Sequence, residues 1–239
     1  MSALSNSPNY FLSSLSSEDA ALLQPHIKLV DLRPATVLYK AEDVIKRVYF
    51  PYTGIVSFVV SVSNGAIVEA GVVGRNSAVG ISTPLDGTVA INEAIVQAPM
   101  SAAAIDAGIM KRFVAEREPL RVSCARHEGM TLVQVQQVAA CNALHNLEQR
   151  LTRWLLQARD LLNSDLVPLT QDTLSQMLGV NRSSVTLAAR RLQEAGLIDY
   201  HRGHIQLLDS EALKCVSCEC YAAINALFFR LTGWSPSSQ

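Results

Sequence analysis

The side chains best suited to metal or redox chemistry gather near the carboxyl end of the chain. The segment CVSCEC, residues 215–220, holds three of the five cysteines, and His201 and His204 lie just upstream. Zinc binds imidazole and thiolate ligands, so His-x-x-His followed by Cys-x-x-Cys is one pattern that could bind it. A thiol that responds to oxidants is a second interpretation, and small buried side chains are a third.

Helical spacing favours the third interpretation. Asp209 or Ser210 can cap a helix over this segment, and Cys215 and Cys218 then share one face, where both can be buried. The five cysteines are unevenly spaced, which indicates reduced thiols rather than a disulfide framework. We therefore predict structural cysteines and no metal site.

A second group of polar side chains lies in LTQDTLSQMLGVNRSSVTLAARRLQEAGLI, residues 169–198. Two helical patterns follow each other there with only a short turn between them. Thr170 can cap the first helix, and Gly179 supplies the turn because glycine accepts positive φ. In the second helix one face is apolar, formed by Val185, Ala188, Ala189 and Leu192. This arrangement predicts a helix-turn-helix.

The opposite face of the second helix is polar and could enter a DNA major groove. The following segment LIDYHRGHIQLL, residues 197–208, predicts two strands around Arg202 and Gly203, which would form a wing. Arg182 is expected to contact a guanine or a phosphate, and Leu187 a thymine methyl. The predicted DNA-binding residues are Thr170, Arg182, Ser183, Ser184, Thr186, Leu187, Arg190 and Arg202.

The amino-terminal half must provide a different kind of domain. The serine-rich opening, residues 1–14, is expected to be a flexible tail, and Ser16 can cap a short helix. Short β-branched and aromatic runs follow, and Ser63–Gly65 is a hairpin signal between two of them. Many short strands predict an antiparallel, jelly-roll-like β-roll over residues 15–110, so the chain is expected to be α+β.

A long helix is expected over residues 111–143, between the roll and a winged helix-turn-helix domain over residues 144–239. Small residues recur along this helix with a spacing of seven, which permits close approach of a second helix. A dimer seam is the favoured interpretation, and packing against the chain's own roll is the alternative. The seam residues would be Val122, Ala125, Gly129, Leu132, Gln136 and Ala139.

This order of elements resembles the Crp/Fnr superfamily of bacterial transcription regulators, over about residues 15–233. The most specific parts are residues 169–198 and the segment VYFPYTGIVSFVV...NGAIVEAGVVGRNSAVG. The resemblance implies a homodimer that binds a palindromic DNA site, with half-sites about one helical turn apart. It also implies RNA polymerase as a partner and a sensor role for the roll.

The resemblance breaks down at the family's ligand sites. Asn92 and Glu93 align with the Arg-Ser pair that holds the cyclic phosphate in nucleotide-binding members, so cyclic AMP is not expected. The first cysteine is Cys124, so the iron–sulfur ligands of oxygen sensors have no counterpart, and haem has little support because His26 is the one histidine before His127. A pocket for another effector would involve Arg75, Asn76, Ser77, Asn92 and Glu93.

The recognition helix also departs from cyclic-AMP-responsive members. Arg182 keeps the first family position, but Ser183 stands in place of a glutamate and Leu187 in place of a second arginine. Because glutamate reads cytosine and arginine reads guanine, the usual half-site of those members is not expected.

Composition narrows the function further. The formal net charge is −1, so a nucleic-acid partner must be inferred from local pattern alone. Without a secretory signal or a long apolar stretch, we expect a cytoplasmic protein and no membrane span. No hydrolase or phosphate-cradling motif occurs, so an enzyme is not predicted. The alternative to a DNA-binding regulator is a ligand-binding or protein-interaction module of the same fold.

Overall fold

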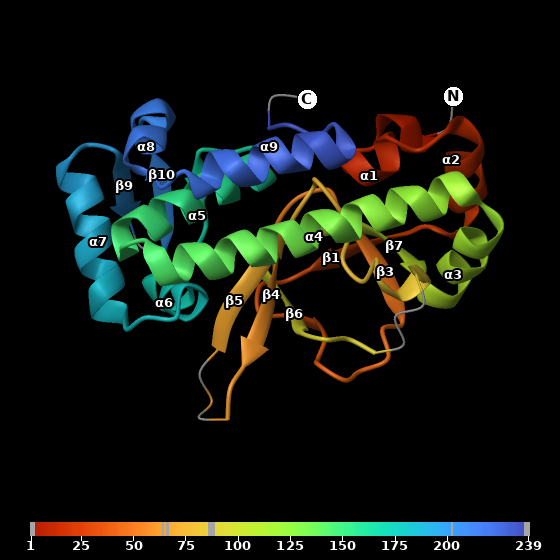
Figure 1. Ribbon diagram of the computed structural model, residues 1–239, viewed down its shortest axis with the longest axis horizontal. Helices are drawn as coiled ribbons and strands as arrows, with labels where there is room; N and C mark the ends of the chain where they lie inside the picture. The colour runs from red at the N-terminus through yellow and green to blue at the C-terminus, as the bar shows by residue number, and fades with distance from the viewer. Residues whose placement is uncertain (1–2, 64, 66, 86–88, 202, 237–239) are drawn as a thin grey trace.

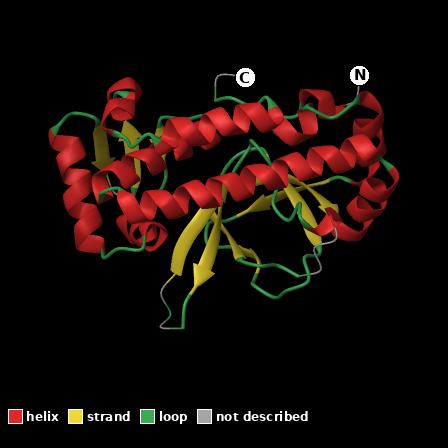
Figure 2. Ribbon diagram, in the orientation of Figure 1, coloured by secondary structure: helices red, strands yellow, loops and turns green. Residues whose placement is uncertain are grey.

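The computed structural model describes residues 3–63, 65, 67–85, 89–201 and 203–236. Its amino-terminal part is a β-roll made of two antiparallel sheets (Figures 1 and 2). One sheet has the order β1-β7-β3 and the other the order β2-β6-β4-β5. The strands are β1 Lys28–Leu32, β2 Val37–Tyr39, β3 Arg47–Pro51, β4 Ile55–Ser61, β5 Ile67–Val73, β6 Glu93–Ala98 and β7 Met100–Asp106.

The hairpin predicted around Ser63–Gly65 joins β4 to β5. These strands pair antiparallel, with Ser61 opposite Ile67 at the end next to the turn. Asn64, the central residue of the predicted turn, lies outside the described residues. Alternate residues of β6 are buried, as expected for a strand with one face on a core.

Residues 3–14 are not a flexible tail, contrary to the prediction for residues 1–14, of which the first two lie outside the described residues. They contain a short 3-10 helix, Ala3–Asn6, and helix α1, Tyr10–Ser13. Phe11 and Leu12 are fully buried, and the Phe11 ring stacks on Phe50 of β3. Three apolar residues of this serine-rich segment belong to the buried core beneath the roll: Leu4, Phe11 and Leu12. The helix predicted at Ser16 is α2, Ser17–Leu23, and Ser16 caps it as expected.

The long helix begins later than residue 111. Helix α3 covers Ala107–Glu116, and α4 covers Glu118–Leu144 after a break at Arg117. Pro119 explains the break, because in a continuous helix its ring would clash with the carbonyl of Ala115 and it has no N–H to donate there, whereas it is accepted in a first helical turn. The buried side of α4 packs on β5 and on α9, Cys220–Thr232, which runs antiparallel beside it (Figure 1).

The carboxyl-terminal domain starts with α5, Leu147–Leu162, whose capping box joins Asn146 and Gln149. It continues with β8 Leu166–Val167, α6 Gln171–Leu178, α7 Arg182–Glu194, β9 Ile198–His201, β10 His204–Leu207 and α8 Ser210–Val216. The predicted order of antiparallel roll, long helix and winged helix-turn-helix is therefore confirmed.

No single helix among the described residues is both long and apolar enough to cross a membrane. Helices α8 and α9 are bent at 108° to each other, and only together do they have the length and apolar composition of a membrane span.

A buried carboxyl group joins the roll to the carboxyl-terminal domain. Glu69 of β5 accepts hydrogen bonds from the Ser57 hydroxyl and, at 2.7 Å, from the indole Nε1 of Trp154 on α5. Burial raises the pKa of Glu69 to about 7, although these hydrogen bonds and the nearby Arg153 oppose the shift. The Glu69 carboxyl group is thus protonated more readily in the folded chain than in the unfolded one.

This raised pKa predicts a pH dependence of stability. Between pH values of about 4.5 and 7 the folded state binds more protons at Glu69 than the unfolded state, so stability falls as pH rises. The change at this one group is up to about 3 kcal/mol. Chemical denaturation from pH 4.5 to 8 should show a shallower decline for Glu69→Gln than for the wild type. The exposed Glu116→Gln is the control, and parallel wild-type and Glu69→Gln curves would refute the assignment.

Candidate DNA-binding site

The two helices of the predicted motif pack through their apolar faces. Leu174, Met177 and Leu178 of α6 are buried, as are Val185, Ala188, Ala189 and Leu192 of α7. Gly179 ends α6 in the left-handed conformation, with φ of +63°. This turn brings α7 across α6 with its polar side turned outward, as the sequence predicts.

Side chains cap both helices at the ends expected to face DNA. Thr170 accepts a hydrogen bond from the backbone of Thr173 at 3.1 Å, and Asn181 accepts one from Ser184 at 2.9 Å. The hydroxyl groups of Ser183 and Ser184 also donate to the Asn181 side chain, at 2.8 and 2.7 Å. These two serines therefore help to hold the helix start in place, and their oxygens can still accept or rotate toward a ligand.

The outward side of α7 carries the predicted contact residues. The side chains of Arg182 and Arg190 are 65% and 74% exposed, and Leu187 is 54% exposed. Ser183 and Thr186 are also exposed, whereas Ser184 is half-buried. Thr170 is exposed at the start of α6. The structure thus gathers seven of the eight predicted residues near one surface, and Arg202, the eighth, lies outside the described residues.

The structure adds acidic and amide partners that sequence reasoning missed. Arg182 Nη1 lies 3.3 Å from Asp172 Oδ1, and Arg190 Nε lies 2.8 Å from Glu194 Oε1. Thr186 donates to Gln171 at 2.7 Å. The Arg190–Glu194 pair could have been found from its i,i+4 spacing. Exposed ion pairs of this kind contribute little to stability, so a ligand can exchange them at low cost.

The wing has the predicted form. Strands β9 and β10 pair antiparallel, with Ile198 opposite Leu207 and His201 opposite His204. The two wing histidines do not join the cysteines of residues 215–220 in a common cluster. Cys215 is exposed on α8 and Cys218 lies beyond the end of that helix, so the expectation that both are buried on one helical face is wrong.

The residues predicted for an effector pocket are spread over different surroundings. Arg75, Asn76 and Ser77 are buried, and the Ser77 hydroxyl lies 2.9 Å from Nδ1 of His127 on α4. Glu93 lies at the start of β6.

Asn92 lines a cavity of about 140 Å³ between the roll and α4. Phe58 and Ala78 of the roll and Glu128 and Thr131 of α4 also line this cavity. Of the five predicted residues, Asn92 alone faces it, so the structure does not assemble the set as one site.

Comparisons with known proteins agree with this architecture. Residues 149–216 match the model of the Crp-like helix-turn-helix domain. No curated protein matches the sequence significantly.

Many solved structures share the fold. A putative transcriptional regulator of the Crp/Fnr family from Eubacterium rectale has a TM-score of 0.67 at 16% identity, covering 87% of this chain and 98% of its own. FixK2 from Bradyrhizobium japonicum has a TM-score of 0.70 at 14% identity, covering 80% and 98%. A CRP-family transcriptional regulator from Thermus thermophilus has a TM-score of 0.65 at 18% identity, covering 88% and 100%.

The protein therefore has the fold of a Crp/Fnr transcription regulator. Within that fold, it contains a Crp-like helix-turn-helix domain. The resemblance drawn from the sequence is confirmed. Two of these three structures are described as transcriptional regulators.

The turn of the motif also contacts the roll, which makes a pair of glycine variants informative. A Cβ at Gly179 would lie 3.1 Å from Val68 of β5, whereas one at Gly196 would meet nothing within 4 Å. Both glycines have positive φ, so alanine should cost each site about 1 kcal/mol of backbone strain. Gly179→Ala should lower the free energy of unfolding more than Gly196→Ala. Adding Val68→Ala should reduce the difference between the two losses of unfolding free energy. Equal losses for the two glycine variants would contradict the close approach of Gly179 to Val68.

Proposed function

We propose that the chain is a sequence-specific DNA-binding transcription regulator that acts as a homodimer on a palindromic site. The observation that carries this proposal is the polar outer side of α7, held outward by its buried apolar side. Its capped start and the adjacent wing support this proposal, because a helix with an exposed polar side can enter a major groove. We also expect it to act in the cytoplasm with RNA polymerase as a partner.

Recognition would begin at the amino-terminal end of α7. Arg182 leaves Asp172 and contacts a guanine edge or a phosphate, and Leu187 meets a thymine methyl. Ser183 and Thr186 contact bases weakly. Thr170 and Ser184 lie at helix starts, where backbone N–H groups favour phosphate, and the positive charges of Arg190 and Arg202 favour phosphate contacts as well.

Selection of genomic DNA fragments with the purified protein tests sequence-specific reading directly. An enriched palindrome with half-sites about ten base pairs apart supports the proposal. Enrichment without a motif that vanishes as salt rises would leave only backbone attraction. A protein that binds no DNA at low salt would favour the alternative, a ligand-binding or protein-interaction module.

Arg182→Ala should lower affinity for the selected site about 5- to 150-fold and relax specificity at one base pair per half-site. Fluorescence anisotropy titrations against the site and its single-base variants measure both effects. Arg33→Ala, which removes an exposed arginine after β1, is the matched control for charge. An equal loss on every sequence would make Arg182 a phosphate contact instead.

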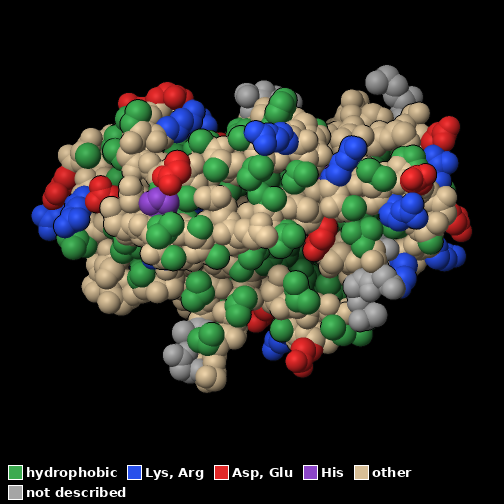
Figure 3. Space-filling model, viewed as in Figure 1, with side chains coloured by type: hydrophobic (Ala, Val, Ile, Leu, Met, Phe, Trp, Pro, Cys, Tyr) green, Lys and Arg blue, Asp and Glu red, His purple; other side chains and the backbone are tan. Residues whose placement is uncertain are grey.

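The dimer proposal rests on a side of α4 that the described part of the chain leaves largely exposed and that borders the cavity beside the roll at Leu132. Val122, Ala125, Leu132, Gln136 and Ala139 are exposed, and Leu132 is 58% exposed. Gly129 is half-buried and faces Leu231 of α9. In Figure 3 uncharged atoms cover most of the middle of this helix, with an acidic side chain near its lower edge, and other charged side chains lie above and below it and at both ends of the molecule. A parallel copy of α4 could cover this side with little desolvation of charge.

Leu132→Arg should convert a dimer to a monomer because two buried arginines would face each other across the two-fold axis. Light scattering after size exclusion separates one 25.9 kDa chain from two. Val60→Arg, at another exposed apolar position on β4, should leave the dimer intact. A wild type that is monomeric at micromolar concentration would refute the homodimer.

The roll is the proposed site of control. A signal bound near the cavity between the roll and α4 would change how α4 packs and so shift the spacing of two recognition helices. Cyclic AMP, haem and an iron–sulfur cluster are not the expected signals, because their family ligands have no counterparts in the sequence.

A further inference from the structure

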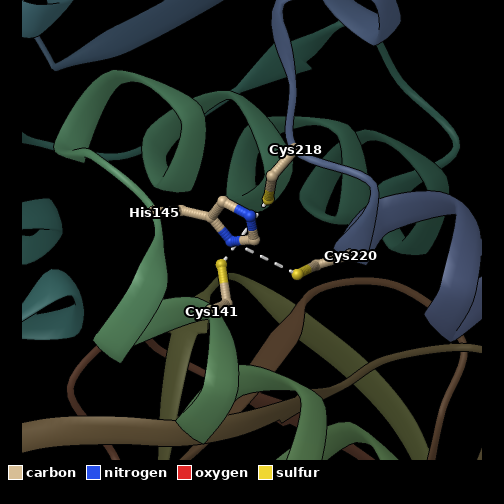
Figure 4. A group of neighbouring side chains, drawn as sticks. All are labelled: Cys141, His145, Cys218 and Cys220. Carbon is tan, nitrogen blue, oxygen red and sulfur yellow. Dashed lines mark hydrogen bonds between the residues drawn. The ribbon is translucent and has the colours of Figure 1, made fainter.

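Three cysteines and a histidine from opposite ends of the carboxyl-terminal half meet beside the hinge between α4 and α5 (Figure 4). Cys141 lies in the last turn of α4 and His145 caps that helix, so both project from the same side. Cys218 lies between α8 and α9, and Cys220 begins α9. All three cysteines are buried, and the four potential ligand atoms lie within 4.8 Å of one another.

We propose that Cys141, His145, Cys218 and Cys220 form a tetrahedral binding site for one zinc ion per chain. The site would join the end of α4 to the start of α9. Neither the resemblance to Crp/Fnr regulators nor the sequence pattern of residues 201–220 assigns this set of ligands.

Two distances between potential ligand atoms match those that zinc imposes. The Cys141 and Cys218 sulfur atoms are 3.6 Å apart, and the Cys220 sulfur lies 3.6 Å from Nδ1 of His145. Zinc–sulfur bonds of about 2.3 Å and zinc–nitrogen bonds of about 2.0 Å place ligands of a tetrahedron about 3.5–3.8 Å apart. Two of the six ligand pairs therefore already have the spacing of a Cys₃His site, and all four ligand atoms lie within 4.8 Å of one another, so small side-chain rotations would complete the tetrahedron.

Groups around the cluster orient the proposed ligands. The Nδ1 atom of His145 faces the cysteines, while its Nε2 lies 3.2 Å from the Glu219 carboxylate. A carboxylate on the outer nitrogen fixes the tautomer and orientation of a metal-binding histidine. Gln137 donates to the Cys220 sulfur at 3.1 Å, an interaction that favours thiolate.

The local charge suits a thiolate-rich site. Three thiolates and a neutral histidine around zinc carry a net charge of −1, and the buried Arg153 lies close enough to interact with Cys141. Arg150 is a second cation that interacts with Cys141. The pKa of Cys141 is lowered by the hydrogen bond with Cys218 first, and by the charge of Arg153 to a smaller extent. The positive charge of Arg153 offsets the net negative charge of the proposed zinc site, which burial would otherwise destabilise.

The donor set selects the metal and its role. Thiolate and imidazole ligands suit zinc, whereas magnesium and calcium require oxygen ligands. Four protein ligands leave no open position, so the ion would be structural and not catalytic. It would fix α8 and α9 against the short turn between α4 and α5. It would thereby stabilise one placement of the helix-turn-helix relative to α4.

Metal binding is measured on the full-length wild type, purified anaerobically with thiols reduced and without a metal-binding tag. We expect one zinc per chain by elemental analysis. Cobalt titration of the metal-free protein should give the ligand-field bands of tetrahedral cobalt and thiolate charge transfer. No bound zinc together with no such spectrum would refute the proposal.

The variants have a matched control within the same segment. Cys218→Ser should lower zinc affinity at least about 100-fold, because it removes a ligand and not merely a surrounding group. Cys215→Ser changes the exposed cysteine three residues earlier and should leave the affinity and the cobalt spectrum unchanged. Retention of the wild-type spectrum by Cys218→Ser would overturn the assignment.

A milder variant separates ligand loss from misfolding. Glu219 is largely exposed, and Glu219→Gln should preserve the fold, weaken zinc binding about 10-fold and leave the cobalt spectrum tetrahedral. Thiol counting and mass analysis of the same anaerobic preparation provide the competing outcome. A disulfide between Cys141 and Cys218 in that preparation would make the cluster a redox pair and refute the zinc site.

Discussion

The free polar side of α7 depends on the burial of its other side in a core that the two parts of the molecule share. Val185, Ala188 and Leu192 belong to the same apolar cluster as Leu155 and Leu156 of α5, and that cluster also includes Ile55 and Val72 of the roll. The orientation of the recognition helix is therefore determined by packing that extends into the roll. A change in the roll can reach α7 through contiguous side chains without a hinge in between.

The same shared core explains which features could be predicted from sequence. Helix caps, the Gly179 turn and the alternation of buried residues depend on neighbours a few positions away, so the Thr170 cap and the apolar side of α7 could be identified correctly. The β4–β5 hairpin has an equally local signal. These features define the fold class and most of the proposed DNA surface.

Features that depend on distant partners could not be predicted in this way. Phe11 is buried because Phe50 lies under it, and nothing in the serine-rich opening indicates this partner. The cysteine cluster requires Cys141 and Cys218, which are 77 residues apart and are brought together by the antiparallel packing of α4 and α9. The expectation of buried cysteines holds for Cys218 but not for Cys215, and only the three-dimensional structure shows which cysteines meet.

The pairing of Arg182 and Arg190 with carboxylates has a consequence for how such a protein would search a genome. Asp172 and Glu194 offset the positive charge of α7, so a featureless phosphate backbone gains little from approaching this surface. Binding to arbitrary DNA would then release few counterions, and the complex would dissociate quickly. A cognate site offers Arg182 a base edge in place of Asp172 while Arg190 meets a phosphate, so the time spent on DNA would depend mainly on sequence and only weakly on charge.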